Sequence, residues 1–289
     1  MNTIEKLLQK ILLSQDLTPE QERTLQSHKT EVTNFLRSEF GNDPVIKYAG
    51  SHEKGTMIRE NYDLDIVCYF PNTDTRSLKE IREDVSNHLK SKYLIEEKAS
   101  AERISDLKGV SVPSGYHIDV VPGRFIEGTN DVFLHVAHGE KERIQTNLKT
   151  HINHIANSGC VPIIRLVKVW ANRNRLNIKT FILELFVVEI LSGSQNKSNL
   201  RESFLKVMEA MKDKFGNVQL VDPANTNNIV SQSINFSDKI MINSAGEKAF
   251  NLLNRSEKIS DWENIFGEAQ TSLSSSSGFT PQAPWCKLC

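Results

Sequence analysis

The chain has 289 residues, of which 38% are hydrophobic and 25% charged, as in globular proteins with one large core or two modest ones. Its 35 basic and 36 acidic residues give a formal net charge of −1, so no global positive field favours strong constitutive binding to nucleic acid. The N-terminus lacks the apolar core of a signal peptide, and Glu184 and Glu189 interrupt the most apolar run, which argues against a membrane span. These features predict two lobes and a cytoplasmic protein.

Apolar residues at helical spacing predict an opening helix over residues 4–12. Thr18-Pro-Glu-Gln21 is a capping box that predicts a second helix, which ends at Gly41. Strands are expected at 45–49 and 65–70, a helix at 78–89, and a further strand at 117–121 that Pro122 and Gly123 close.

From about residue 141 the pattern becomes helical, with helices expected at 144–155, 163–174, 180–191, 200–212 and 237–253. We therefore predict an α+β fold with three parts. Residues 1–140 form N-terminal helices and a catalytic lobe, residues 141–268 a helical lobe, and residues 269–289 a flexible, serine-rich tail. The single CxxC of Cys286 and Cys289 has no second ligand pair and does not support a zinc site.

The residues with the clearest chemistry are three aspartates. Asp63 and Asp65 begin an apolar strand, where alternation points both carboxylates to one side. Asp119 lies between Ile118 and Val120 in a second strand. If the two strands are neighbours, the three carboxylates converge on a two-metal site, and oxygen ligands select Mg²⁺, with Mn²⁺ as the alternative. The competing interpretation is three separate surface aspartates that cap turns.

A glycine-serine turn precedes these aspartates. Gly50 lets the backbone approach a phosphate closely, and Ser51 offers a hydroxyl and an amide at the start of a helical turn. The pair is informative only because of its spacing to Asp63. Together these residues predict in-line attack of a hydroxyl on the α-phosphorus of a nucleoside triphosphate, with loss of pyrophosphate. Asp119 is then the ligand, and the candidate base, nearest that hydroxyl.

The helical half carries a polar stripe of Arg165, Lys168, Asn172 and Arg175 opposite an apolar face. Such a stripe is suited to hold the outer charge of a triphosphate. The alternative is an ordinary solvated helix face.

The motifs GSHEKGT, DLD and HIDVVP resemble the nucleotidyltransferase superfamily that includes poly(A) polymerases and tRNA CCA-adding enzymes. The segments RLVKVW, KTFILELFVVEIL and LVDPANTNNIV are similar to the oligoadenylate synthetase branch and its bacterial relatives, the CD-NTases of anti-phage signalling. The resemblance runs from residue 50 to residue 230.

This resemblance implies a bilobal, polymerase-beta-like fold in which a mixed-sheet catalytic lobe and a helical lobe flank a cleft. By position, Lys168 is expected to hold the donor triphosphate, and Thr180 and Phe181 to lie beside the base. Asp222 and Asn228 belong to a segment that shapes the lobe interface in relatives, although an Asx-rich turn also explains them.

The function that we predict is magnesium-dependent synthesis of a cyclic or linear oligonucleotide messenger from nucleoside triphosphates. One alternative is an enzyme that adds nucleotides to an RNA 3′ end or to a protein. The other is a catalytically silent module that senses a nucleotide or nucleic acid. The expected partners are an operon-encoded regulator or a protein that conjugates to the C-terminal tail.

Overall fold

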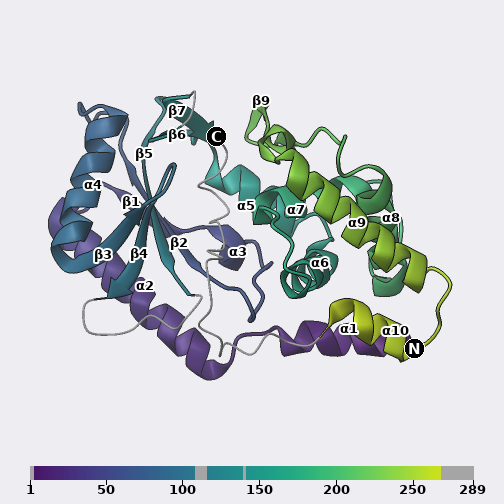
Figure 1. Cartoon of the computed structure of the whole chain (residues 1–289). Coiled ribbons are helices and arrows are strands. Elements are labelled where there is room, and N and C mark those ends of the chain that lie inside the picture. The colour runs from purple at the N-terminus through teal and green to yellow at the C-terminus, as the bar shows by residue number, and fades with distance from the viewer. Residues whose placement is uncertain (1–2, 108–115, 139–140, 268–289) are drawn as a thin grey trace. The chain divides into compact units, whose positions relative to one another are not determined.

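The computed structural model of the chain describes residues 3–107, 116–138 and 141–267 (Figure 1). These residues form two compact units. The helical unit contains residues 3–16, 54–61 and 153–267, and the sheet unit contains 17–53, 62–107, 116–138 and 141–152. The chain therefore enters the helical unit three times, whereas the sequence placed one boundary after residue 140. The tail at 269–289, with Cys286 and Cys289, lies outside the described residues.

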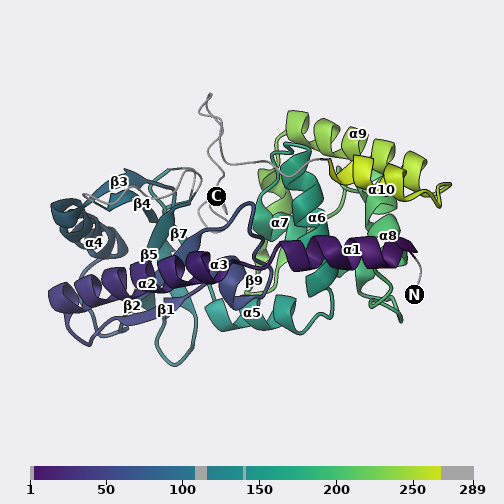
Figure 2. The same ribbon diagram turned by 90° about the horizontal axis from the view of Figure 1, so that it is seen from below.

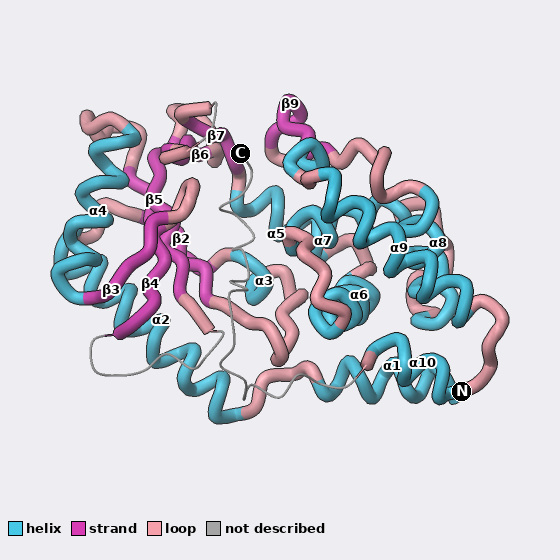
Figure 3. The backbone as a smooth tube through the Cα atoms, viewed as in Figure 1, coloured by secondary structure: helices cyan, strands magenta, loops and turns pink. Residues whose placement is uncertain are grey.

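The sheet unit is built on a mixed sheet, drawn in magenta in Figure 3. Its main strand order is β1-β2-β5-β4-β3, and β6 joins β5 to β7. Strands β2 and β5 are parallel, and the other described pairs are antiparallel. This mixed sheet confirms the predicted α+β class. The strands are β1 Val45–Tyr48, β2 Leu64–Phe70, β3 Tyr93–Glu97, β4 Glu102–Leu107, β5 Ile118–Phe125, β6 Val132–His135 and β7 Arg143–Thr146.

Helices α2 (Pro19–Phe40) and α4 (Leu78–Lys92) belong to this unit (Figure 2). The capping box predicted for α2 is confirmed: Thr18 Oγ1 accepts from Gln21 N at 3.2 Å, and Gln21 Oε1 accepts from Thr18 N at 3.0 Å. Phe70 of β2 meets Phe40 of α2 edge-on, with ring centroids 5.3 Å apart. Side chains alternate along β2, so Asp65 and Phe70 point to opposite faces of the sheet. The face that carries Asp65 is therefore directed away from α2.

The prediction that Pro122 and Gly123 end the strand is wrong, because β5 continues to Phe125. Proline is tolerated where no partner strand needs its missing N–H. In the described pairing, β4 reaches Val120 and β6 begins opposite Arg124, so the edge that faces them is unpaired at Pro122. A Cβ at Gly123 would lie 2.7 Å from side-chain atoms of β6, so glycine here permits the close approach of β6.

The helix predicted from residue 144 is also partly wrong. Ile144 lies in strand β7, and the helix that follows, α5, spans Leu148–Ala156. Ile144 pairs with Leu134 of β6, and both side chains are buried. A strand of four residues is too short for its alternating pattern to be told apart from helical spacing in the sequence. Only the pairing with β6 identifies β7 as a strand.

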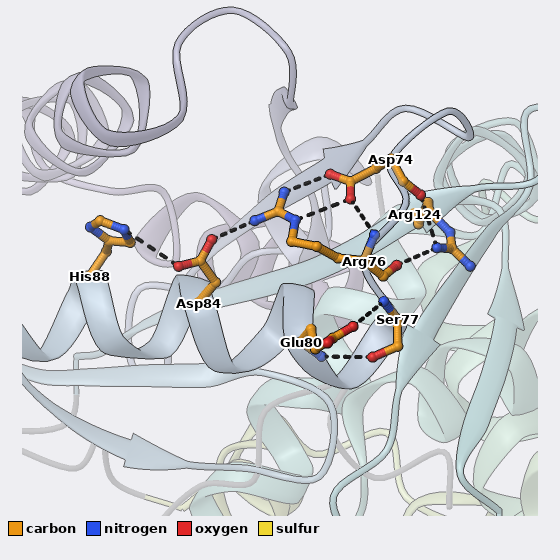
Figure 4. Close-up of polar contacts among 7 residues, drawn as sticks. All are labelled: Asp74, Arg76, Ser77, Glu80, Asp84, His88 and Arg124. Atoms are coloured by element: carbon orange, nitrogen blue, oxygen red, sulfur yellow. Dashed lines mark hydrogen bonds and ion pairs between the residues drawn. The ribbon is translucent and has the colours of Figure 1, made fainter.

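An ionic network stabilises the turn between β2 and α4 (Figure 4). Arg76 contacts Asp74 and Asp84, and Ser77 and Glu80 form a capping box at the start of α4. Arg124 of β5 donates to the carbonyl oxygen of Asp74 at 3.1 Å. The network thus connects the end of β5 to the entry of α4.

The helical unit contains α1, α6 to α10 and a short hairpin of β8 and β9 (Figures 1 and 2). Helices α8 and α9 pack so closely that a Cβ at Gly246 would lie 2.7 Å from Met211 Cβ. Within 3–107, 116–138 and 141–267, no helix combines the length and the apolar character needed to cross a membrane. The elements are α1 Thr3–Ser14, α6 Val161–Arg173, α7 Thr180–Leu191, α8 Leu200–Asp213, β8 Val221–Asp222, β9 Asn225–Ile229, α9 Phe236–Leu253 and α10 Ile259–Phe266.

Candidate active site

Two of the three predicted carboxylates lie side by side in the sheet unit. Asp65 of β2 is directly opposite Asp119 of β5 in the parallel register. Opposite residues on adjacent strands point to the same face, and both side chains are buried. Asp63 lies just before β2 and is partly exposed. The strand pairing expected from the sequence is therefore present.

Gly50 forms the floor of this site. It begins the short helix α3 (Gly50–Glu53) with φ +66°, a left-handed conformation that favours glycine. A Cβ at this position would lie 1.6 Å from Asp65 Oδ2. The carboxylate of Asp65 therefore occupies the space that any other residue would fill. Ser51 follows in the same turn and is buried.

Two further residues contact the aspartates. The Arg103 guanidinium donates to both oxygens of Asp119, from Nε to Oδ1 at 2.8 Å and from Nη2 to Oδ2 at 3.0 Å. His117 Nε2 lies 3.5 Å from Asp63 Oδ2 and 4.0 Å from Asp119 Oδ2. The carboxylates thus belong to a compact charged cluster in which the Arg103 guanidinium supplies the positive charge.

The donor chemistry of this cluster fits a hard divalent cation, because its carboxylates supply only oxygen. The glycine floor beside Asp65 also leaves the backbone close to those oxygens. As arranged, however, no group of three or more His, Cys, Asp or Glu residues in the described part of the chain is set to hold a metal ion. Asp65 and Asp119 are the residues that would hold it, joined by Asp63, once Asp119 is released from Arg103.

A second polar cluster is buried in the helical unit. Glu184 of α7 accepts from Lys54 Nζ at 2.7 Å and from Thr56 Oγ1 at 2.5 Å. Lys168 of α6 donates to the carbonyl oxygen of Thr56 at 2.8 Å, and its Nζ lies 3.9 Å from Glu184 Oε1. These bonds fix the segment that immediately follows the glycine-serine turn against α6 and α7.

The charge of Glu184 depends on these lysines. Burial alone would raise the pKa of the carboxyl, but the positive charges of Lys54 and Lys168 outweigh burial and hold its pKa below the ordinary value. A buried carboxylate with two cations is costly to disturb, because removing one member leaves the others uncompensated.

We expect Glu184→Gln to lower the free energy of unfolding by about 3–5 kcal/mol, since the buried Lys54 would then lose the carboxylate to which it donates at 2.7 Å. Chemical denaturation followed by circular dichroism measures this loss. Glu189→Gln on the same helix is the matched control, because Glu189 is exposed, and it should change stability by less than about 0.5 kcal/mol. Equal effects of the two substitutions would contradict the assignment.

The same ion pair predicts a pH dependence. A carboxyl whose pKa is lower in the folded state contributes stability above its ordinary value of 4.5, and this contribution is lost as the pH falls through the folded pKa. The wild-type protein should therefore lose stability as the pH falls below 4.5. The Glu184→Gln variant should lack this loss of stability when thermal melting curves are recorded at several acidic pH values. Parallel pH profiles of the two proteins would contradict the prediction.

The nucleotide-binding residues predicted in the helical half have different environments. Lys168 is buried, Thr180 begins α7 and is half-buried, and Phe181 is fully buried, with Lys54 Nζ 4.9 Å from its ring centre. The Phe181 ring therefore offers no exposed face for stacking in this structure. The roles of these three residues in binding a nucleotide stay predictions.

The predicted cationic stripe is not continuous. Arg165 donates to the carbonyl oxygen of Met57 at 3.1 Å and to Asp16 at 2.7 Å. Helix α6 ends at Arg173, so Arg175 lies beyond it, with φ +54°. Partners within the helical unit therefore take up Arg165 and Lys168, two members of the stripe.

Asp222 and Asn228 lie together in the hairpin of β8 and β9. Asn228 Nδ2 donates to Asp222 Oδ2 at 3.3 Å, and Ala224 N donates to Asp222 Oδ1 at 2.8 Å. The second bond is an Asx turn, as the simpler interpretation of this segment predicted.

Sequence reasoning missed Arg103, His117, Lys54 and Thr56. The first lies on a strand that was not predicted, and the second was treated only as the start of a strand. Lys54 and Thr56 were visible inside the motif GSHEKGT. Their partner Glu184 was also visible, as a charge within an apolar run, and such a charge requires a buried counter-ion.

No model of a protein family matches the chain. A curated relative, the cyclic AMP-AMP-AMP synthase of Escherichia coli (strain MS 115-1), is 23% identical over 265 residues, which cover 76% of this chain and 81% of the relative. Among solved structures, the E. coli MS115-1 CdnC in complex with HORMA-deltaN has a TM-score of 0.72 and 18% identity, over 92% of this chain and 98% of that chain. The CD-NTase CdnG of Bradyrhizobium diazoefficiens, in complex with GTP, has a TM-score of 0.75 and 10% identity, over 92% and 96%.

Proposed function

We propose that this chain, a CD-NTase by its motifs, its fold and its curated relative, joins nucleoside triphosphates into a cyclic oligonucleotide messenger and releases pyrophosphate at each bond. The observation that carries the proposal is the pairing of Asp65 with Asp119 on adjacent parallel strands, with Gly50 beneath Asp65. The same chemistry without ring closure would give a linear product.

In this reaction Asp65, Asp119 and Asp63 would hold magnesium, and the ion would supply charge stabilisation at the phosphates and activation of the attacking hydroxyl. Gly50 and Ser51 would present backbone amides and a hydroxyl to the triphosphate. Asp119 is also the proposed acceptor for the proton of that hydroxyl. Mn²⁺ is expected to replace Mg²⁺, since both prefer oxygen ligands.

Lys168 is proposed to contact the donor triphosphate. Its amine reaches the carbonyl oxygen of Thr56, so the residues after the glycine-serine turn and a phosphate-binding amine are held together. Thr180 and Phe181 are proposed to lie beside the base, as the family resemblance implies. Because Phe181 is buried, stacking on it would require the start of α7 to open.

We place the reaction in the cytoplasm, in anti-phage defence, by analogy with the CD-NTases. One relative is solved in complex with a HORMA protein, and on that ground we propose that a regulator protein controls this enzyme too. Conjugation through the C-terminal tail is a separate proposal about residues 269–289, which lie outside the described part of the chain.

Incubation of the purified protein with labelled nucleoside triphosphates and Mg²⁺ or Mn²⁺, followed by phosphatase, tests the proposal. We expect phosphatase-resistant label that migrates as a small oligonucleotide. The rival enzyme would transfer label to added RNA or to a protein. A sensing module would bind nucleotide tightly without any turnover, so either outcome would contradict the proposal.

A further inference from the structure

Arg103 lies in one row of the sheet with three carboxylates. The registers place Glu96 of β3 opposite Arg103 of β4, Arg103 opposite Asp119 of β5, and Asp119 opposite Asp65 of β2. Directly opposite residues share a face. The guanidinium therefore has a carboxylate on each side, Asp119 toward the site and Glu96 toward the edge of the sheet.

In the structure Arg103 binds Asp119. The two hydrogen bonds, of 2.8 and 3.0 Å, use both carboxylate oxygens, and the two side chains are 5% and 1% exposed. A divalent ion needs the same oxygens. It would also be repelled by a guanidinium a few ångströms away, in surroundings where little water screens the charges. Metal and Arg103 therefore compete for Asp119.

Glu96 offers an alternative partner for the displaced cation. Its side chain is 53% exposed, so it is accessible. Lys98, by hydrogen bonding, and Arg103, by its charge, help to hold the pKa of Glu96 below its usual value, so the carboxylate is charged at neutral pH. A guanidinium that leaves Asp119 then moves from one carboxylate of the row to the next and is not left buried without a counter-charge.

We propose that Arg103 is a movable counter-ion. It neutralises Asp119 while no metal is bound, and it transfers to Glu96 when a divalent ion binds. The inference rests on the proposed function, because it assumes that metal binds at Asp65 and Asp119. Its consequence is a resting protein with weakened metal affinity, since binding must first break a buried, bidentate ion pair.

Mn²⁺ binding without nucleotide, measured from the electron paramagnetic resonance signal of the free ion, tests the proposal. Arg103→Gln should bind Mn²⁺ roughly tenfold more tightly than the wild type, or better, because a buried positive charge is removed. Glu96→Gln should bind it more weakly, because the row then lacks the second carboxylate to which Arg103 transfers. Glu97→Gln is the matched control. Glu97 is the next residue on β3, directed to the opposite face, and its substitution should change nothing.

The double variant separates the transfer from simple charge effects. In the Arg103→Gln background, Glu96→Gln should have no further effect on Mn²⁺ affinity. A persistent effect would mean that Glu96 acts on the metal directly, and it would overturn the transfer. Equal or weaker Mn²⁺ binding by Arg103→Gln would overturn the competition. If that variant does not fold, Arg103→Lys decides the question by the same criterion, because a flexible amine holds Asp119 less firmly.

Asp65→Asn distinguishes this proposal from the proposed function. If Asp65→Asn retains wild-type Mn²⁺ affinity, the metal lies elsewhere and the proposed site fails. If Asp65→Asn loses Mn²⁺ binding and Arg103→Gln leaves it unchanged, the site stands and only the role of Arg103 fails.

Discussion

Asp65→Asn should abolish product synthesis while the protein remains folded. The amide has the size of the carboxylate but lacks the negative charge that holds the metal, and the loss of a metal ligand costs several kcal/mol of transition-state stabilisation, or roughly a thousandfold in rate. Folding should be unchanged or improved, because the substitution relieves repulsion between Asp65 and the adjacent Asp119.

Initial rates of pyrophosphate release, with melting temperatures for both proteins, check this result. Asp43→Asn, at an exposed position of the same unit, is the control and should retain wild-type activity. If the Asp65→Asn protein is fully active, Asp65 takes no part in the reaction. A large fall in melting temperature would instead show that Asp65 has a structural role.

Gly50→Ala should have a comparably large effect, for a steric reason. The new Cβ would lie 1.6 Å from Asp65 Oδ2, so Asp65 or the turn must move. The left-handed backbone adds about 1–2 kcal/mol of strain for alanine. We expect synthesis to fall by roughly a hundredfold or more, because catalysis depends on positions within about 1 Å.

Gly128→Ala is the matched control for this substitution. Gly128 also has a positive φ, of +71°, but nothing lies within 4 Å of its Cβ position. The two variants therefore share the backbone strain and differ in the clash with Asp65. Melting curves should show destabilisation by the shared backbone strain in both variants, and more in Gly50→Ala because of the clash, whereas activity assays should show synthesis lost only in Gly50→Ala. Similar activity in the two variants would contradict the role of Gly50 as the floor of the site.

Local signals in the sequence were sufficient for much of the fold. The helix predicted at 180–191 has the same bounds as α7, and the capping box at Thr18 forms as expected. Apolar residues next to Asp65 and Asp119 predicted both strands, and the structure pairs them. These features depend on neighbours a few positions apart, where periodicity and capping chemistry are informative.

The remaining features depend on contacts between distant residues. Strands β3, β4 and β6 are short, and only pairing with other strands defines them, so Arg103 could not be placed against Asp119. Lys54 and Glu184 are 130 positions apart. The sequence shows that Glu184 is unusual, because its surroundings are apolar, but not that Lys54 is its partner.

The site around Asp65 and Asp119 is proposed to join nucleotides to one another. The most direct test is mass spectrometry of the phosphatase-resistant product that the wild-type protein forms from all four nucleoside triphosphates. We predict a product with the mass of nucleoside monophosphates joined with loss of one water per bond, absent with Asp65→Asn. Nucleotide found only on RNA or protein, or an equal yield from the variant, would contradict this role of the site.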